Sequence, residues 1–431
     1  MQLLVNPSPE KWKKQLARPV QKTKEINKIV KPILKKVQKN GDKALRKFAQ
    51  EYDHVQLESL VVTPEEIQAA LTLVSKELKE AIGVAKTNIE RFHAAQANPE
   101  LIEEVMPGVI CRRKSVPIQR VGLYIPGGTA PLFSTVLMLG VPAVLAGCAE
   151  IVLCTPPNRE GKIHPAILYT AQLVGISKII KVGGAQAVAA LTFGTESVPQ
   201  VDKIFGPGNQ YVTAAKQLAT KYGVAIDMPA GPSEVLVYAD ESAIPAFVAS
   251  DLLSQAEHGV DSQVVLVTPS EKFAKKVLKE IEVQLEALPR KDIAAKALQN
   301  STAVVMEDES KALALINHYA PEHLIIAVEN EEEAVNAIYN AGSVFIGNFT
   351  PESAGDYASG TNHTLPTYGY ARNYSGVSLD SFVKKITYQK ITAEGLKKLG
   401  PVVEVMAANE LLEAHKNAVT IRLNYLKSKK K

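Results

Sequence analysis

From residue 121 onward, short apolar runs alternate with stretches in which apolar residues recur every three to four positions. Short apolar runs bounded by turn residues predict buried strands, and the longer period predicts helices. Such an alternation is typical of a doubly wound unit built around a parallel sheet. The expected strands are 121–125, 150–154, 178–182 and 203–205, and the expected helices are 131–145, 165–174, one from 185, and 211–222.

A second set of apolar runs follows the first, with helical stretches between its members. We therefore predict an α/β fold made of two tandem doubly wound units, each an incomplete Rossmann-like sheet. The repetition of the pattern is typical of a duplication. The strands of this second set are expected at 234–238, 263–267, 302–306, 324–328 and 343–347.

The two ends of the chain depart from this alternation. The first 25 residues are polar and rich in lysine, and they are expected to form an arm with one short helix. Helical periodicity follows at 26–51, 64–71 and 75–95, and the rhythm is lost after about residue 376. The expected domains are an arm at 1–25, a first α/β domain formed by 26–120 and 233–375, a second α/β domain at 121–232, and a small C-terminal appendage at 376–431.

Length, composition and charge narrow the class of protein. A chain of 431 residues is long enough for two or three domains with sizeable cores. Its 46% hydrophobic and 22% charged residues are ordinary for a globular protein. The formal net charge of +4 is too small to argue for a nucleic-acid partner.

Cysteine usage and the apolar segments bear on the compartment. Cys111, Cys148 and Cys154 have no disulfide-like spacing, which fits a reducing cytoplasm. The most apolar region, 130–154, is interrupted by glycine, proline and glutamate, so we expect a buried helix, a turn and a buried strand there. The start of the chain lacks a signal-peptide pattern. A cytoplasmic location without membrane association is therefore expected.

The stretch from Ser254 to His258 carries the first chemical signal. Gln255 and His258 are three residues apart near the expected end of a helix, so they would lie on one face. An amide oxygen beside an imidazole is half of a metal site. Three further histidines have neighbours that suggest a chemical role. His323 follows Glu322, and His363 ends a run rich in glycine, serine and threonine. His415 follows Glu410 on a short helix expected at 409–415.

Three glycine-rich turns, 126–128, 183–186 and 206–209, each end an expected strand and precede an expected helix. Ligands of open α/β sheets bind at the carboxyl ends of the strands. Glycine lets backbone N–H groups approach a phosphate, and the amino end of a helix favours anions. None of the turns completes the GxGxxG pattern, and a purely structural turn explains any one of them alone equally well.

Taken together, these segments resemble the histidinol dehydrogenase family over nearly the whole chain beyond the arm. So many motifs in the same order make the resemblance specific. The segments that carry it are 121–134, 183–187, 206–209, 226–234, 254–258, 320–324, 355–363 and 415–419.

The resemblance implies a four-electron oxidation of L-histidinol through L-histidinal to L-histidine, with two NAD+ used in turn. It also implies one Zn²⁺ per subunit and a homodimer with shared active sites. Imidazole, amide and carboxylate donors suit Zn²⁺ without a thiolate. The first α/β domain would carry the metal and the catalytic residues, and the second would carry the NAD-binding turns.

Carried over position by position, the resemblance also implies residue roles. Glu322 and His323 would perform the acid–base catalysis. The appendage would supply His415 to the site of the partner subunit. The metal ligands would be Gln255, His258, Asp356 and His415; the substrate would contact these four residues, Glu322 and His323, together with Ser233, His363 and Glu410; and NAD+ would contact Tyr124, Gln186 and Asn209.

Neither periodicity nor spacing selects these residues without the resemblance. Asp356 could cap a turn, Glu322 could be a first-turn helix charge, and Glu410 could be a surface carboxylate. Two other functions stay open on the residues alone. One is a zinc hydrolase on a related α/β scaffold, and the other is a non-catalytic metabolite sensor. The Glu322–His323 pair counts against the sensor, and the glycine turns count against the hydrolase.

Overall fold

The computed structural model describes residues 1–19, 23–127 and 130–429, which form two compact units. The main unit comprises residues 1–96 and 118–382, and the smaller unit comprises 97–117 and 383–431. The expected arm, 1–25, includes residues 20–22, which lie outside the described residues.

A six-stranded parallel sheet forms one half of the main unit. Its order is β1-β11-β10-β9-β12-β13. The arm therefore contributes an edge strand as well as the expected helix, a strand that the sequence pattern missed because its apolar run is too short to indicate one. The strands are β1 (Gln2–Val5), β9 (Glu234–Ala239), β10 (Gln263–Thr268), β11 (Thr302–Val305), β12 (His323–Ala327) and β13 (Ser343–Ile346).

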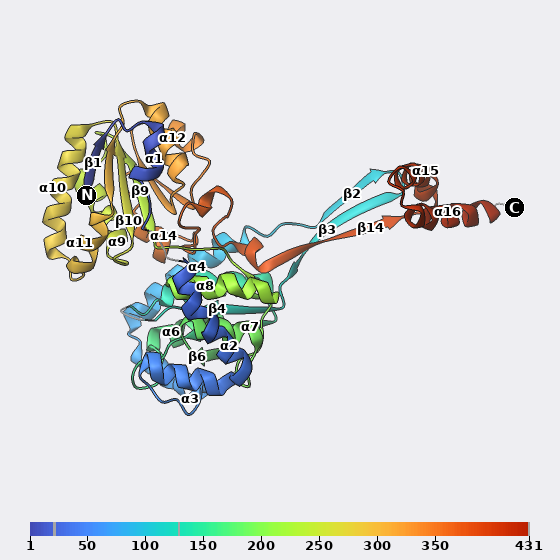
Figure 1. Cartoon of the computed structure of the whole chain (residues 1–431), viewed down its shortest axis with the longest axis horizontal. Helices are drawn as coiled ribbons and strands as arrows, with labels where there is room; N and C mark the ends of the chain where they lie inside the picture. The colour runs from blue at the N-terminus through green and yellow to red at the C-terminus, as the bar shows by residue number, and fades with distance from the viewer. Residues whose placement is uncertain (20–22, 128–129, 430–431) are drawn as a thin grey trace. The chain divides into compact units, whose positions relative to one another are not determined.

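Side chains alternate between the two faces of this sheet, and helices cover both faces (Figure 1). Val235 and Val237 pack with one set of helices, whereas Leu236 and Tyr238 pack with the other. The central strand β9 is therefore apolar on both sides, as expected inside a parallel sheet. The first set is α9 (Pro245–Ala256), α10 (Glu271–Ala287) and α11 (Lys291–Gln299); the second includes α1 (Pro9–Gln15), α12 (Glu309–Tyr319) and α13 (Glu331–Asn336).

A five-stranded parallel sheet forms the other half of the main unit, in the order β6-β5-β4-β7-β8. Leaving β1 aside, both sheets follow the doubly wound order 3-2-1-4-5, so the predicted fold class is confirmed. The expected buried helix and strand within 130–154 are α5 and β5. The elements are β4 (Arg120–Tyr124), α5 (Phe133–Ala146), β5 (Glu150–Thr155), α6 (Pro165–Val174), β6 (Lys178–Lys181), α7 (Gly184–Phe193), β7 (Lys203–Phe205), α8 (Gln210–Ala219) and β8 (Ala225–Ile226).

The helices that precede β4 cover the five-stranded sheet, which corrects the expected grouping of 26–120 with 233–375. Helix α2 (Thr23–Phe48) packs on α7 and α8, α3 (Pro64–Leu73) on α6, and α4 (Lys76–Ala94) on α5. An amphipathic pattern shows which side of a helix is apolar but not which sheet that side covers. The sequence therefore predicted these helices without predicting their partner.

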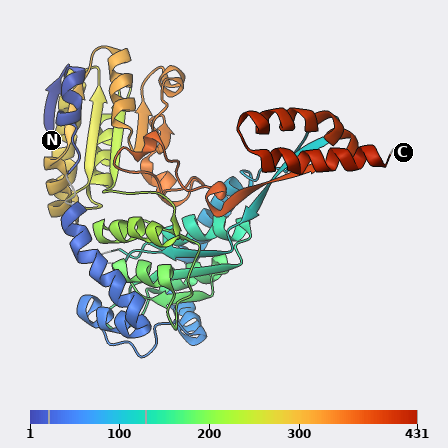
Figure 2. The ribbon, with the colours of Figure 1, turned by 45° about the vertical axis from the view of Figure 1, so that its right-hand side comes forward.

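The smaller unit differs from the expected appendage, 376–431, because it also takes in residues 97–117. Strand β3 (Val109–Pro117) lies between β2 (Leu101–Met106) and β14 (Val383–Ile391) in an antiparallel sheet. Helices α15 (Ala393–Asn409) and α16 (Glu413–Ser428), drawn in red in Figure 2, pack against each other.

The single short helix expected at 409–415 is in fact the junction between α15 and α16. Leu411 lies between them with φ of +59°, which no helix continues through. Among the described helices, none has the length and apolarity needed to cross a bilayer.

Candidate functional site

Buried polar side chains gather at the amino ends of β9 and β12, where the strand order of the six-stranded sheet reverses. His323 begins β12, Glu322 precedes it, and Gln255 lies in the last turn of α9. Their exposed fractions are 3%, 5% and 0%. Helix α14 (Glu352–Tyr357) adds Glu352 and Asp356, one turn apart. We expected ligands at the carboxyl ends of strands, and this cluster lies at the opposite ends.

The backbone of Glu234, the first residue of β9, organises the cluster. Its N–H donates to Oε2 of Glu322 at 2.9 Å. With the Gln255 amide nitrogen directed at Oε1 of Glu352, 2.6 Å away, the Gln255 oxygen also accepts from this N–H at 2.9 Å. The Glu234 carbonyl lies 3.2 Å from Nδ1 of His323. Because a carbonyl only accepts, Nδ1 carries a proton, and Nε2 is the nitrogen that gains and loses one.

The cluster contains several buried carboxyl groups that cannot all be ionised at little cost. Burial raises the pKa of Glu322 to about 8, against the attraction of His323. Burial likewise raises the pKa of Glu352 to about 8. Burial alone would lower the pKa of His323, but the carboxylates of Glu352, Glu322 and Asp356 outweigh it and raise that pKa well above 6.5. Excess negative charge of this kind is relieved by a bound cation.

The donor set of the cluster fits a metal ion. Among the described side chains, Oε2 of Glu352 is buried without a hydrogen-bond partner, and the buried Nε2 of His323 and Oδ1 of Asp356 have only each other, 3.4 Å apart. The ligand atoms of these three residues lie within 4.8 Å of one another. Buried polar atoms normally have partners, so their convergence indicates a ligand. Nitrogen and oxygen donors of this type suit Zn²⁺ and its neighbours in the first transition series.

Glu352 is a site residue that the sequence pattern did not single out. It is 1% exposed and accepts from the amide of Gln255. Its only signal in the sequence is its position four residues before Asp356, on the same face of a helix. That spacing is common on exposed helices and carries little weight by itself.

His258 and His363 both lie close enough to Asp356 to interact with its charge. His258 lies just beyond the end of α9, so it does not share the helix of Gln255 as expected; its N–H donates to the Gln255 carbonyl at 3.3 Å. His258 keeps part of its surface exposed. The protein around its imidazole nevertheless removes water from it and lowers its pKa, and the charge of Asp356 opposes this shift. Nδ1 of His363 lies 2.9 Å from the Asp356 carbonyl, and its Nε2 lies 3.1 Å from Oγ1 of Thr135.

Of the remaining substrate and metal candidates, Ser233 lies in the main unit, and Glu410 and His415 do not. Ser233 is half-buried and immediately precedes β9, next to the organising Glu234. Glu410 and His415 belong to the smaller unit. Glu410 caps the carboxyl end of α15, His415 lies in the first turn of α16, and both are exposed.

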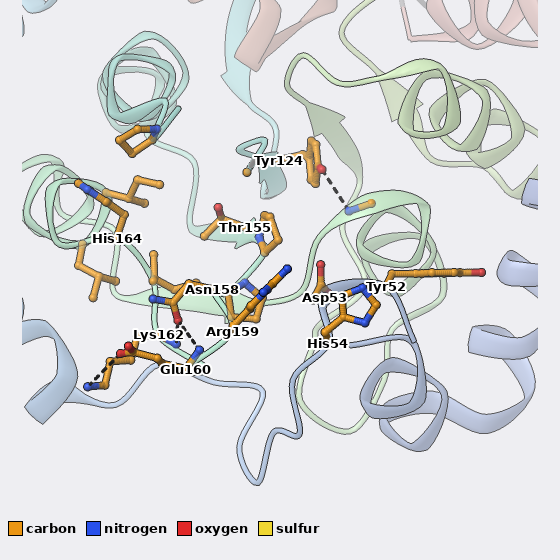
Figure 3. A pocket seen from close by; sticks show the side chains of 18 of the residues that line it. Tyr52, Asp53, His54, Tyr124, Thr155, Asn158, Arg159, Glu160, Lys162 and His164 are labelled. Carbon is orange, nitrogen blue, oxygen red and sulfur yellow. Dashed lines mark hydrogen bonds and ion pairs between the residues drawn. The ribbon is translucent and has the colours of Figure 1, made fainter. Parts of the chain in front are cut away.

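A large pocket of about 1130 Å³ lies at the carboxyl ends of the five-stranded sheet (Figure 3). Tyr124, Gln186 and Asn209 all line it. The Tyr124 hydroxyl accepts from the N–H of Gly184 at 3.1 Å, and burial raises the pKa of Tyr124 to about 12. Asn209 caps α8, with its Oδ1 accepting from the N–H of Tyr211 at 3.0 Å. The pocket is thus bordered by the amino ends of two helices, where backbone donors favour anions.

The structure also explains one of the glycine turns and adds lining residues that the sequence did not indicate. Gly206 has φ of +128°, and a Cβ there would lie 2.1 Å from the Tyr124 carbonyl oxygen. Asp53, His54 and Arg159, labelled in Figure 3, line the pocket from outside the predicted motifs. Gly128, the last glycine of the first turn, lies outside the described residues.

Comparisons with known proteins agree with this architecture. The sequence profile of the family described as histidinol dehydrogenase matches residues 16–423. A histidinol dehydrogenase of Bacteroides thetaiotaomicron is 62% identical over 99% of this chain and 100% of its own, and one of Salmonella typhimurium is 54% identical over 97% and 96%.

A solved structure gives the same result. The crystal structure of histidinol dehydrogenase from Elizabethkingia anophelis has a TM-score of 0.97 and 57% identity, and covers 99% of both chains. These matches span the cluster, the pocket and the smaller unit alike. The chain therefore belongs to the histidinol dehydrogenase family and is an NAD-dependent oxidoreductase of histidine biosynthesis.

Proposed function

We propose that this chain uses Zn²⁺ and two NAD+ in turn to oxidise L-histidinol through L-histidinal to L-histidine. The observation that carries the proposal is the buried Glu322–His323 pair beside the carboxylates of Glu352 and Asp356, whose ligand atoms lie within 4.8 Å of one another and of His323. An acid–base pair next to a cation site suits an alcohol whose own imidazole and amine are metal ligands. The family assignment argues against the zinc hydrolase alternative.

Gln255, His258 and Asp356 would hold the metal from the main unit. Glu352 would fix the amide of Gln255 so that the Gln255 oxygen, which already accepts from the Glu234 N–H, could coordinate through its second lone pair. When bound, Zn²⁺ would fix the imidazole and amine of histidinol, orienting the alcohol. His363 would steady Asp356 through its backbone carbonyl. Ser233, beside Glu234, would contact the substrate.

The protein's acid–base work falls to two adjacent side chains. A cation bound among the carboxylates would oppose the shifts that raise the pKa values of His323 and Glu322, so that both could accept protons. His323, whose Nδ1 proton faces the Glu234 carbonyl, would then take the hydroxyl proton on Nε2 as hydride leaves for NAD+. The aldehyde must then be hydrated before a second hydride can leave. Glu322, fixed by the Glu234 N–H and 3.7 Å from His323, would take a proton from that water.

NAD+ would occupy the pocket lined by Tyr124, Gln186 and Asn209. Its volume of about 1130 Å³ exceeds what a small substrate needs and is adequate for a dinucleotide. The pyrophosphate would face the amino ends of α7 and α8, where backbone N–H groups point outward. The buried Tyr124 hydroxyl, hydrogen-bonded to Gly184, would keep that turn in place.

We propose a homodimer in which Glu410 and His415 serve the site of the partner subunit. The smaller unit exposes many large apolar side chains, more than a small sheet and two helices leave to water without a partner. A second copy of this chain is the occupant consistent with a closed two-fold assembly. The exposed side chains are Val402, Val405, Met406, Leu411, Leu412, Ile421 and Tyr425.

The direct test of the function is NADH formation with L-histidinol by the zinc-loaded protein. Two NAD+ are expected to be reduced per histidinol consumed, with histidine as the product. One NADH per histidinol and accumulation of the aldehyde would contradict the four-electron reaction. Absence of NADH under these conditions would reject the proposed substrate.

Removal of the metal is expected to abolish this activity, and added Zn²⁺ is expected to restore it. His258→Ala and Asp356→Ala should bind the metal far more weakly, because each removes a donor of the site. Metal content by mass spectrometry and turnover are measured on the same samples. Full turnover by a metal-free preparation would contradict the assignment.

Glu322→Gln is expected to slow the oxidation of histidinal to histidine more than the oxidation of histidinol to histidinal. Only the aldehyde needs an activated water, and glutamine retains the size of the side chain but cannot accept a proton. Single-turnover rates of NADH formation from each substrate separate the two steps. Equal slowing of both steps would show that Glu322 does not activate water.

The thiols are expected to be dispensable. Burial raises the pKa of Cys148 to about 11 and raises that of Cys154 as well, so neither offers a thiolate at neutral pH. Alanine variants of Cys111, Cys148 and Cys154 should keep turnover near that of the wild type. A folded but inactive single variant would indicate a thioester route for the aldehyde. Free thiols in all three places also support the proposed cytoplasmic location.

A further inference from the structure

The N-terminal arm is fixed to the six-stranded sheet on both sides of α1. Strand β1 pairs with β11, and Trp12 of α1 is buried, with its Nε1 donating to the Pro7 carbonyl at 2.9 Å. The Ala17 carbonyl accepts from Nε2 of Gln263 at 3.2 Å. These contacts place the next residue, Arg18, at the amino ends of the strands, beside the buried cluster.

The guanidinium of Arg18 forms a bidentate ion pair with the Glu234 carboxylate. Its Nη2 donates to Oε1 at 2.8 Å, and its Nε donates to Oε2. The two side chains are 13% and 2% exposed. A fork of this kind fixes direction as well as distance, which a lysine in the same place would not.

Glu234 passes this constraint to the cluster through its backbone. The same residue that holds Arg18 donates its N–H to Glu322 and offers its carbonyl to Nδ1 of His323. Gln255 accepts from that N–H as well. A shift of Glu234 would therefore displace Glu322, His323 and Gln255 together.

Arg18 also holds the segment that leads into the catalytic pair. Its Nη2 donates to the Tyr319 carbonyl at 2.8 Å, and its guanidinium lies 3.9 Å from the centre of the Tyr319 ring. Ala320 follows with φ of +52°, a conformation that alanine rarely adopts and that its surroundings must maintain. Pro321 separates Ala320 from Glu322. Arg18 thus contacts both the side chain of Glu234, whose backbone hydrogen-bonds to the pair, and the backbone segment that leads into the pair.

We infer that Arg18 is a positioning residue of the active site, through which the N-terminal arm sets the geometry of Glu322 and His323. The inference rests on the proposed function, because it presupposes that this pair performs the acid–base steps. It assigns the arm a role beyond packing. It also predicts which kinetic constants respond when the ion pair is broken.

The test compares Arg18→Met and Arg18→Lys with the matched control Arg372→Met. Arg372 also donates to the end of α12, at the His318 carbonyl, but has no bond to Glu234. Both Arg18 variants are expected to lose about tenfold to a hundredfold in kcat for histidinol, the usual effect of a small misplacement of reacting groups. Arg372→Met should leave kcat within about twofold of the wild type on the same reasoning. KM for NAD+ should stay unchanged in every variant, and each variant should still hold zinc at saturating Zn²⁺, although displacement of Gln255 weakens zinc binding in the Arg18 variants.

Two further measurements separate positioning from stability. Guanidinium ion added to Arg18→Ala should recover part of the lost kcat, and the effects of Arg18→Met and Glu234→Gln on kcat should be non-additive. A parallel loss of zinc, NADH binding and kcat would show a merely structural role and overturn the inference. If Arg18→Met does not fold, Arg18→Lys decides the question by the same criteria.

The activity of His323→Ala distinguishes a failure of the Arg18 inference from a failure of the proposed function. A normal kcat in Arg18→Met and Arg18→Lys, alongside an inactive His323→Ala, would overturn the role of Arg18 alone. A fully active His323→Ala would instead overturn the proposed function of the pair. In that case a low kcat in the Arg18 variants would arise through other residues, and the inference about Arg18 would be overturned as well.

Discussion

Replacing His323 with alanine is expected to slow histidinol oxidation by about a hundredfold to ten-thousandfold, the usual contribution of a positioned general base. Nδ1 of His323 faces the Glu234 carbonyl, which leaves Nε2 to take the hydroxyl proton. The variant should retain zinc, since Gln255, His258 and Asp356 are untouched. It should also bind histidinol. Turnover, metal content and calorimetric binding of histidinol are the three measurements.

His318→Gln provides the matched control, because His318 lies on α12 outside both the cluster and the pocket and packs against Trp12. Its turnover should equal that of the wild type. Loss of zinc in His323→Ala would reassign His323 as a ligand with Glu352 and Asp356, an arrangement that their spacing within 4.8 Å also permits. Unchanged turnover with zinc retained would exclude His323 as the base.

The alternation of the sheets was predictable because buried parallel strands are short, continuous apolar runs. Local signals defined helix α6 well, because its expected bounds coincide with the observed Pro165–Val174. Proline occupies the first helical position, and Gly175 follows the last one in the left-handed conformation. Strand β1 escaped prediction because an edge strand of four residues has no comparable signal. Its place beside β11 depends on contacts across 300 residues of chain.

For the same reason, the sequence pattern did not predict which sheet α2–α4 cover or which residues form the smaller unit. Both depend on which apolar surfaces meet in space, which a one-dimensional period does not encode. Local signals did fix helix starts: Ser75, the first residue of the helical stretch expected at 75–95, caps α4, and its Oγ accepts from the N–H of Leu78 at 3.2 Å.

The candidate site was predictable only through the family resemblance. The Gln255–His258 spacing indicated a metal on one helix face, yet His258 lies beyond the end of α9. Glu352 and Arg18 lay outside every chemical pattern, although Glu352 lies in the cluster and Arg18 bonds to the residue that organises it. Their importance follows from burial and from bonds to residues distant in the chain, such as the pairing of Arg18 with Glu234.

Mixing two inactive variants, His258→Ala and His415→Ala, is expected to restore activity after the subunits exchange. His258 lies in the main unit and His415 in the smaller unit, exposed in the first turn of α16. If each metal site takes His415 from the partner subunit, a mixed dimer holds one site with both lesions and one site with neither. Two-fold symmetry then sets the recovery at up to about half of the wild-type activity per mixed dimer.

The alternative arrangement gives a different result with the same proteins. If His415 completed a site within its own chain, every site of the mixed dimer would keep one lesion, and activity would stay at the level of the separate variants. Differently tagged subunits, purified through both tags, prove that the mixed dimer has formed. A doubly substituted chain mixed with wild type serves as the control, because sharing in trans gives each of its sites one lesion. Proven mixed dimers of the two single variants without recovered activity would contradict the shared site.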